Sequence, residues 1–308
     1  MKISRLFSFL LLLCAAVHGQ SPTQRSLVPQ NGKISFTWKG DSMRHEWEPY
    51  SAILLPVSLP GCKDRFYMQF DLGSPYSFFY SRPLEAIRRA YPKTAIDTGA
   101  KTYNGIFSLG KMKIIATGMP VQLFGDSVLD HSKDHRTIIG TIGSDIINNK
   151  VVMINYPEQA LVLADTVAPA LASVNFMYMQ GRVLLPATIK NKQTLLYFDT
   201  GSSAFELLID RATWQQLAAA NATPVRYPVQ SWNNTMYANT IATNDSISIA
   251  ASQLPLHQVS YMEGASTAQI NQMMKMGIGG MTGNKLFIRH TLVLDTRNKK
   301  FGIIAGSK

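Results

Sequence analysis

Two copies of a short motif place an aspartate after an apolar run and before a glycine and a serine. They are FDLGS at residues 70–74 and FDTGSS at residues 198–203. A carboxylate at the end of an apolar strand is costly to bury unless it has a partner or a function. If Asp71 and Asp199 meet, both cannot ionise easily, so the pair shares one proton. The ionised member then activates water and the protonated member polarises a carbonyl, which is the chemistry of amide hydrolysis without a metal.

Asp97, in IDTGA, is a third candidate for a member of the carboxyl pair, but its position in the chain argues against this role. LLPVSL at residues 54–59 matches LLPATI at residues 184–189, and each is followed by a polar turn, a second apolar run and Asp-x-Gly-Ser. This alternation of apolar and polar residues is typical of half-buried strands. Asp97 lies outside the repeat, so we expect it in a surface turn, with Asp71 as the counterpart of Asp199.

The repeat continues to the far end of each half of the chain. Gly143 and Gly283 are 140 residues apart, whereas the two repeat aspartates are 128 apart. The second half is therefore about a dozen residues longer in its middle. Each half also contains one helix-like segment, at residues 83–91 and 211–220.

A duplicated unit of this kind can fold into two lobes related by a pseudo-twofold axis. Each aspartate then lies on a tight loop that faces the axis. Gly73 and Gly201 allow the two loops to approach closely, because a side chain there would separate the backbones. The two carboxyl groups can then meet around one water molecule.

The chain resembles the bilobal, pepsin-like (retropepsin-like) aspartic proteases, and more closely the exported aspartyl-protease-like proteins of Bacteroidetes-type bacteria. The matching stretches are the two aspartate motifs, IIGTIGSDIINNKVVMINY and GIGGMTGNKLFIRHTLVLDTRNKKFGI, within residues 51–304. The resemblance implies a mostly β fold of two pseudo-symmetric acid-protease-like β-barrel lobes, with short helices and a central cleft. It also implies no cofactor and no metal.

By the same resemblance, Asp71 and Asp199 form the catalytic dyad. Ser74 and Ser202 match positions that hydrogen-bond to the aspartates. The residues expected to support the dyad or bind substrate are Gly73, Ser74, Thr200, Gly201, Ser202 and Tyr103.

The first motif departs from the family at Leu72, where a threonine or serine is usual. The two hydroxyls of the family brace the paired loops across the axis, and here only Thr200 keeps its half. A lost hydrogen bond costs about 1 kcal/mol. Leu72 instead packs into the gap, which allows folding but can tilt the dyad.

The tyrosine-bearing hairpin that covers substrate in this family is expected at KTYNGIF. Tyr103 stands there beside Asn104-Gly105, a turn pair typical of hairpins. In the second half, SWNNTMY places Trp232 and Tyr237 in a loop that either faces the cleft or packs on the surface.

Other residues that could form a metal, thiol or nucleic-acid site give weaker signals. His131 and His135 have helical metal-ligand spacing, but HSKDH lacks the glutamate of a metalloprotease, so no metal is expected. Cys62 has no histidine near it in the sequence, which disfavours a thiol catalyst. The formal charge of +11 comes from scattered Lys and Arg rather than a basic helix, so nucleic-acid binding is not expected.

The first 19 residues are typical of a secretory signal peptide, with Lys2 and Arg5 before a short apolar run. Cys14 would leave with this leader, so Cys62 would have no disulfide partner within the chain. The expected organisation is a signal peptide (1–19), an N-terminal extension that packs outside or closes a sheet (20–50), a protease lobe (51–166), a linker (167–174) and a second lobe (175–308). We expect a secreted or periplasmic monomer with no stable membrane anchor once the leader is removed.

Three functional hypotheses follow from these residues. In the first, the chain is an exported aspartic endopeptidase that acts on protein or peptide. In the second, favoured by Leu72 and the indistinct flap, it is a catalytically weak or inactive module that binds peptide or glycan in the cleft between the lobes. In the third, the repeat forms two separate small barrels and the aspartates never meet.

Overall fold

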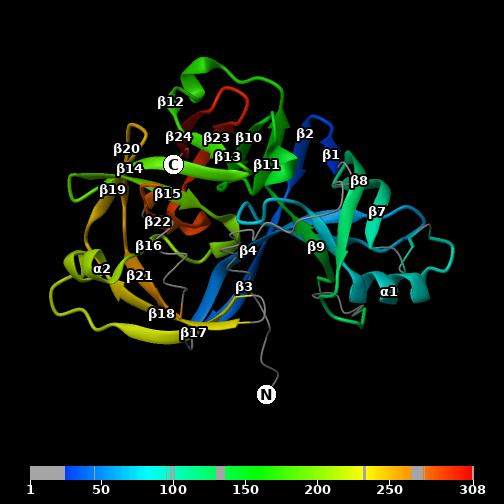
Figure 1. Cartoon of the computed structure of the whole chain (residues 1–308), viewed down its shortest axis with the longest axis horizontal. Helices are drawn as coiled ribbons and strands as arrows, with labels where there is room; N and C mark the ends of the chain where they lie inside the picture. The colour runs from blue at the N-terminus through cyan, green and yellow to red at the C-terminus, as the bar shows by residue number, and fades with distance from the viewer. Residues whose placement is uncertain are drawn as a thin grey trace.

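The computed structural model describes residues 25–306, except 45, 95, 98, 100, 130–135, 232–233, 265–272 and 274. The predicted signal peptide lies outside the described residues. The chain folds into two β lobes joined by a third sheet, with the N-terminal lobe on the right of Figure 1 and the C-terminal lobe on the left. The mostly β fold of two lobes expected from the sequence is confirmed.

The N-terminal lobe is built on a sheet with the strand order β1-β8-β6-β9-β5-β4-β3, in which β7 pairs with β4 and β8. Its strands are β1 (Ser26–Pro29), β3 (Thr37–Met43), β4 (Glu46–Ser58), β5 (Phe66–Phe70), β6 (Phe78–Tyr80), β7 (Thr102–Leu109), β8 (Met112–Gln122) and β9 (Ile138–Ile142). Alternate residues at the start of β8 are buried, as a strand with one core face requires. Helix α1 (Ser81–Ala90) buries Leu84 and Ile87.

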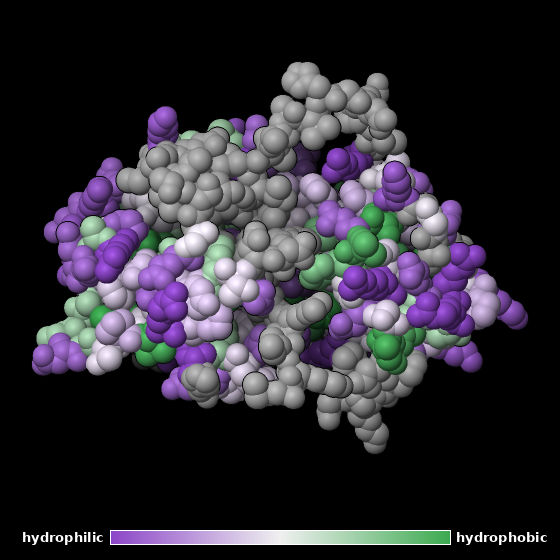
Figure 2. Space-filling model, turned by 60° about the horizontal axis from the view of Figure 1, so that its bottom comes forward, coloured by the Kyte–Doolittle hydropathy of each residue, from purple (hydrophilic) through white to green (hydrophobic). Residues whose placement is uncertain are grey.

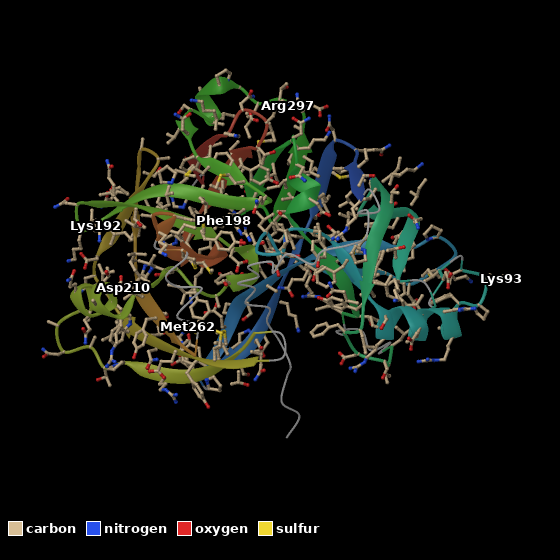
Figure 3. The ribbon with its side chains drawn as sticks, in the orientation of Figure 1. Lys93, Lys192, Phe198, Asp210, Met262 and Arg297 are labelled. Carbon is tan, nitrogen blue, oxygen red and sulfur yellow. The ribbon has the colours of Figure 1, made fainter. Side chains whose placement is uncertain are left out.

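The C-terminal lobe repeats this plan in a sheet with the order β17-β18-β21-β16-β22-β15-β14-β19-β20, in which β13 pairs with β14. Its strands are β13 (Met177–Met179), β14 (Arg182–Ile189), β15 (Lys192–Phe198), β16 (Leu208–Ile209), β17 (Val225–Ser231), β18 (Asn234–Ala242), β19 (Ser246–Ile249), β20 (Ser252–Pro255), β21 (Gln258–Glu263) and β22 (Ile278–Thr282). Helix α2 (Arg211–Leu217) begins after Asp210, which is labelled in Figure 3. The Asp210 carboxylate accepts the N–H groups of Ala212 and Thr213.

The strand before each repeat aspartate is paired in the same way in both lobes. β5 runs parallel to β9 with Phe70 beside Ile142, and β15 runs parallel to β22 with Phe198 beside Thr282. Short 3₁₀ helices follow the repeat glycines at η1 (Ser144–Ile147) and η4 (Asn284–Phe287). The sequence repeat is therefore a structural repeat.

A sheet with the order β12-β24-β23-β10-β11-β2 joins the lobes. Its strands are β2 (Gly32–Ser35), β10 (Val151–Asn155), β11 (Ala160–Ala164), β12 (Val174–Asn175), β23 (His290–Asp295) and β24 (Lys300–Ala305). In its middle, β10 pairs with β23 so that Met153 lies opposite Val293. These residues are repeat equivalents, 140 positions apart, so the pseudo-twofold axis passes between them.

Three features differ from the expected organisation. Strand β4 runs unbroken through the expected boundary between residues 50 and 51, so the N-terminal extension is continuous with the first lobe. The helix-like segments are shorter or shifted, since α1 begins at Ser81 and α2 ends at Leu217. The η2 turn (Pro169–Leu171) lies within the segment expected as a linker, and β12 begins at its last residue, Val174.

The extra dozen residues of the second half are accounted for by β17 and its turn. The start of β7 pairs with β8, and its equivalent in the second lobe, β18, pairs with β21. The end of β7 pairs with β4, and its equivalent, β19, pairs with β14. One strand of the first lobe thus corresponds to two in the second. Within the described residues, β17 has no counterpart in the first lobe.

No helix among the described residues has the length and apolar character needed to cross a membrane. The outer face shown in Figure 2 is mostly hydrophilic, with hydrophobic side chains between the hydrophilic ones on the half that carries α1, β7 and β8.

Candidate active site

The two repeat aspartates lie where parallel strands end next to the other lobe. Asp71 follows β5 and donates its N–H to the carbonyl of Ile142 at 2.9 Å. Asp199 follows β15 and donates its N–H to the carbonyl of Thr282 at 3.0 Å. Each aspartate backbone is thus anchored to the neighbouring parallel strand at the same repeat position.

The two carboxyl groups are buried, and each packs against the glycine of the opposite motif, Asp71 against Gly201 and Asp199 against Gly73. Asp71 is 1% exposed and Asp199 is 0% exposed. No N–H or O–H group of the described residues donates to Asp71 Oδ2. A proton shared with Asp199 would satisfy this oxygen, as in a dyad of two carboxyl groups that share one proton. The expectation of two separate barrels is wrong.

The surroundings of the pair are unequal. Burial raises the pKa of Asp71 well above its usual value, and the charge of Asp199 and the hydrogen bond between them add to the rise. Burial also raises the pKa of Asp199, but hydrogen bonds from Ser202 and the Gly201 N–H oppose this. The proton therefore favours Asp71, and the negative charge favours Asp199.

The glycines of the two motifs pack directly on the opposite aspartate. A Cβ on Gly201 would lie 2.5 Å from Asp71 Oδ1, and a Cβ on Gly73 would lie 2.7 Å from the carboxyl carbon of Asp199. Both distances are shorter than any van der Waals contact. The lobes meet so closely at these glycines that any side chain there would force the carboxyls to move.

We expect Gly201→Ala to lower any hydrolytic rate by about 100-fold, because misplacement by an ångström has an effect of that order. Peptide hydrolysis by the variant and by the parent chain measures this. Gly99→Ala is the matched control, since its Cβ would lie 3.4 Å from Asp97 Oδ1 in an exposed loop. Equal rates in the Gly201 variant and the parent would contradict the close approach.

Thr200 joins the two aspartate loops through its hydroxyl. Its Oγ1 accepts the Leu72 N–H at 2.8 Å and donates to the Phe70 carbonyl at 3.0 Å. Leu72 is fully buried and packs in the main hydrophobic core, in keeping with the packing expected of it. The brace between the lobes therefore has one hydroxyl, and that hydroxyl has both a donor and an acceptor.

No protein-family model and no curated protein matches the sequence. Among the solved structures that match is the crystal structure of aspartic proteinase from Irpex lacteus. That match has 13% sequence identity and a TM-score of 0.47, and it covers 90% of this chain and 98% of that chain. A likeness at this level carries no argument about activity, so the chemistry rests on the geometry of the site.

The serines of the two motifs play different roles. Ser202 Oγ donates to Asp199 Oδ2 at 2.8 Å. Ser74 Oγ donates instead to the carbonyl of Tyr76 at 2.7 Å, and Ser74 bonds to Asp71 through its backbone N–H, which donates to the Asp71 carbonyl at 3.1 Å. The Gly73 N–H donates to Asp71 at 2.9 Å. The first carboxyl thus lacks the hydroxyl donor that the second one has.

Tyr103 does not lie at a hairpin tip. The predicted turn at Asn104–Gly105 is wrong, because β7 continues through both residues as an irregularity in its pairing with β8. Asn104 Oδ1 accepts the Gly118 N–H at 2.7 Å, and the Tyr103 ring packs edge-on against Phe79. The structure places Tyr103 against the core of the first lobe, not beside the dyad.

The remaining expectations fall on other parts of the chain. Asp97 is exposed and accepts the Gly99 N–H, as a turn residue does. Tyr237 lies on β18 under the guanidinium of Arg226. His131, His135 and Trp232 lie outside the described residues. Among the described residues, no three His, Cys, Asp or Glu side chains are grouped to hold a metal ion.

Asn284, which was not predicted as a site residue, holds the second aspartate loop. Its Nδ2 donates to the Thr200 carbonyl at 3.0 Å and to Ser203 Oγ at 2.9 Å. Its Oδ1 accepts the hydroxyl of Tyr156 at 2.7 Å. Asn284 directly follows the repeat glycine Gly283, and this position was the signal that could have identified it.

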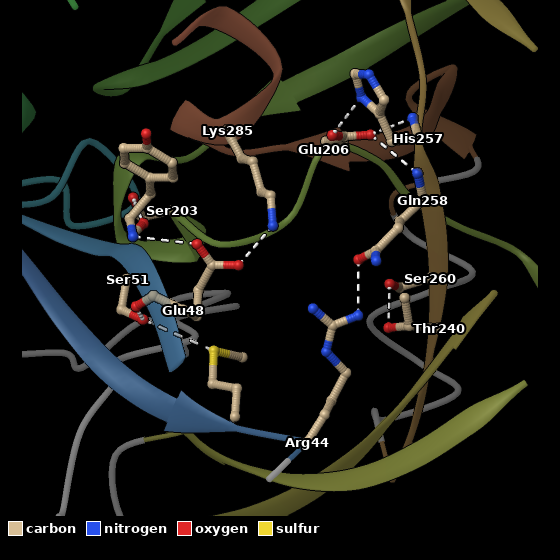
Figure 4. Close-up of polar contacts among 12 residues, drawn as sticks. Arg44, Glu48, Ser51, Ser203, Glu206, Thr240, His257, Gln258, Ser260 and Lys285 are labelled. Atoms are coloured by element: carbon tan, nitrogen blue, oxygen red, sulfur yellow. Dashed lines mark hydrogen bonds and ion pairs between the residues drawn. The ribbon is translucent and has the colours of Figure 1, made fainter. Parts of the chain in front are cut away.

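The sequence also gave no sign that the β3–β4 hairpin would reach the opposite lobe (Figure 4). Glu48, on β4, forms an ion pair with Lys285 at 2.5 Å, and both side chains are largely buried. Ser203 Oγ donates to the Tyr50 carbonyl at 2.6 Å. Through these two contacts, the first lobe supports the segment that follows Asp199 and the η4 helix beside it.

Proposed function

We propose that this chain is an exported aspartic endopeptidase that hydrolyses peptide bonds of a protein or peptide substrate. The supporting observation is that the buried carboxyl groups of Asp71 and Asp199 each lie against the glycine of the opposite motif and that both have raised pKa values. Export rests on the leader-like residues 1–19 and implies a secreted or periplasmic protein without a stable anchor once the leader is removed. That the protein is a monomer is a separate part of the proposal. The kinship with Bacteroidetes-type proteins belongs to the same proposal.

The unequal dyad assigns a role to each carboxyl in this mechanism. The Asp199 carboxylate takes a proton from water as the water oxygen attacks the carbonyl carbon. Asp71 gives its proton to the carbonyl oxygen, which yields a neutral tetrahedral diol and leaves the dyad with one proton. When the C–N bond breaks, the proton taken by Asp199 passes to the departing nitrogen and a diol proton returns to Asp71. No covalent bond to the protein is needed.

The pH dependence follows from the two pKa values. Activity needs Asp199 ionised and Asp71 protonated. Because burial raises both pKa values, the rise in activity on the acid side lies above the usual carboxyl range of about 4. The loss of activity on the alkaline side occurs at a still higher pH, because the pKa of Asp71 is raised more than that of Asp199. We expect a mildly acidic optimum.

Cleavage of a chemically unfolded protein by the purified chain, from about pH 3 to about pH 7, tests this function. Asp199→Ala is measured beside it, and each protein is assayed with and without a peptide inhibitor that mimics the tetrahedral intermediate. Inhibitable cleavage that is lost in Asp199→Ala is the expected result. Cleavage that persists in the variant would refute the dyad as the catalyst.

The second candidate is a binding module that holds peptide or glycan without hydrolysis. The observation that favours it is the single-hydroxyl brace, in which Leu72 packs in the core instead of supporting the dyad. Absence of cleavage at every pH, together with saturable binding of the inhibitor by a folded chain, would identify this function.

A further inference from the structure

Corresponding faces of the two lobes flank the dyad with the same row of positions. In the first lobe the row crosses β4, β5, β9 and β6; in the second it crosses β14, β15, β22 and β16. The four neighbours in the first row are Leu54, Gln69, Thr141 and Phe78. The four neighbours in the second row are Leu184, Tyr197, Met281 and Leu208.

Both rows lie on the strand face that carries the aspartates. Side chains alternate along a strand, so Gln69 and Tyr197, each two residues before an aspartate, share its face. The intervening residues Phe70 and Phe198 point the other way, into the main hydrophobic core. The two rows are therefore equivalent walls beside the dyad, one from each lobe.

The walls differ in chemistry at their two central positions. Gln69 and Thr141 are polar, and Thr141 Oγ1 is bonded to the hydroxyl of Tyr80 at 2.7 Å. Their equivalents, Tyr197 and Met281, belong to an apolar cluster. One wall thus presents an amide and a hydroxyl where the other presents a ring and a thioether.

Gln69 has an unused hydrogen-bond donor beside the dyad. The residue is 6% exposed, and its Nε2 is buried without a hydrogen-bond partner among the described residues. Buried amide groups are nearly always paired in folded proteins, because an unpaired one is unfavourable. An acceptor supplied by a bound substrate would satisfy this donor.

Tyr197, in contrast, has already used its hydroxyl. The hydroxyl donates to the Gly73 carbonyl of the other lobe at 3.1 Å. This bond fixes the ring beside the dyad, within the apolar cluster that also contains Met281. The second wall therefore lacks a free donor corresponding to Gln69 Nε2.

We propose that the substrate carries unlike side chains on the two sides of the dyad: a polar one bearing a carbonyl acceptor, such as glutamine, against Gln69 and Thr141, and a large apolar one against Tyr197 and Met281. The pseudo-twofold axis passes through the dyad, so chain segments on either side of the bond at the dyad meet equivalent walls. Because the walls differ, the preferred side chains differ. This inference rests on the proposed function for the position of the substrate.

Uncleavable peptide isosteres with a reduced amide at the reactive position provide the test. Four isosteres carry Gln–Leu, Leu–Gln, Leu–Leu or Gln–Gln around that position, and calorimetry gives their dissociation constants. We expect one mixed isostere to bind about tenfold more tightly than Leu–Leu, the effect of one hydrogen bond to a buried donor. Equal affinities, a preference for Leu–Leu, or no binding by any isostere would overturn the inference.

Variants of each wall give the second part of the test. Gln69→Leu is expected to make Leu–Leu the tightest isostere, whereas Met281→Gln is expected to favour Gln–Gln. Gln193→Leu, on the exposed start of β15, is the matched control and should keep the parent order. Circular dichroism checks that each variant is folded. A change in the order of isostere affinities in either wall variant is sufficient to support the inference. An unchanged order in the folded wall variants contradicts the inference.

The binding measurement separates this inference from the proposed hydrolysis. A chain that selects a mixed isostere but cleaves no substrate would keep the unlike walls and refute the peptidase. A chain that cleaves through the dyad but binds all four isosteres equally would keep the peptidase and refute the unlike walls.

Discussion

Replacing Thr200 by valine is expected to lower the free energy of unfolding by about 2 to 4 kcal/mol. The substitution keeps the shape of the side chain but removes the hydroxyl that pairs with the Leu72 N–H and the Phe70 carbonyl. Both backbone groups would then be buried without a partner, and each such group costs about 1 to 3 kcal/mol. Urea denaturation followed by fluorescence measures the change.

The control for this prediction is Thr117→Val, an exposed position on β8 where the same substitution should change stability by less than about 0.5 kcal/mol. Hydrolysis should also fall in the Thr200 variant, since the brace sets the separation of the two loops. A Thr200 variant as stable as the Thr117 variant would show that the single-hydroxyl brace has no structural role.

Asp71→Asn is expected to affect activity and stability in opposite directions. Hydrolysis should fall by about 1,000-fold or more, because the dyad loses its shared proton and its general acid. Stability should improve near neutral pH, because a carboxyl with a raised pKa is removed from a buried site. The gain is about 1.4 kcal/mol for each pKa unit of the shift that is relieved.

The sign of this effect follows from proton binding. Both dyad pKa values are raised in the folded chain, so above about pH 4 the folded state holds more protons than the unfolded state. The stability contributed by the pair is therefore fully present below the unfolded pKa values and is lost as the pH rises through the folded ones. Asp71→Asn should make the decline in stability between about pH 4 and about pH 7 shallower.

Urea denaturation at about pH 4 and at about pH 7 measures how steeply the free energy of unfolding declines with pH. Asp97→Asn serves as the control, because Asp97 is exposed in a loop although it too begins an Asp-x-Gly sequence. A slope that is the same in the Asp71 variant, the Asp97 variant and the parent would mean that the Asp71 carboxyl is not proton-linked to folding.

The duplication is the reason that the lobes and the aspartate pair could be predicted from the sequence. A single Asp-x-Gly is a weak signal, but its second copy at the same place in a repeated strand order selects Asp71 over Asp97. The structure brings Asp71 and Asp199 together, and Gly73 and Gly201 lie against them. Because both copies adopt the same backbone path, an element predicted in one half can be checked against the equivalent residues of the other half.

Features present in one copy alone were harder to predict. Asn104–Gly105 has the local preference for a turn, but the Asn104 side chain pairs with the Gly118 N–H and the strand continues. Ser74 has the motif position of Ser202, but the Tyr76 carbonyl takes its hydroxyl. In each case a tertiary contact outweighed the local pattern.

The wall residues were missed for a different reason. Gln69 and Tyr197 were counted only as members of the apolar runs FYMQF and LLYF. Alternation shows that they lie on one face of a strand, but it does not show that this face meets the other lobe rather than solvent. That knowledge requires the packing of the two lobes.

The pairing of Met153 with Val293 at the axis has an evolutionary consequence. A strand that pairs with its own repeat copy has the self-complementary geometry of a symmetric homodimer, from which one chain with two lobes can arise by gene fusion. In such a homodimer every substitution occurs twice, so a glutamine wall and a tyrosine wall cannot coexist. Fusion removes this restriction and lets one half mutate alone. The covalent link between the lobes is therefore what permits Leu72 to stand opposite Thr200 and Gln69 opposite Tyr197.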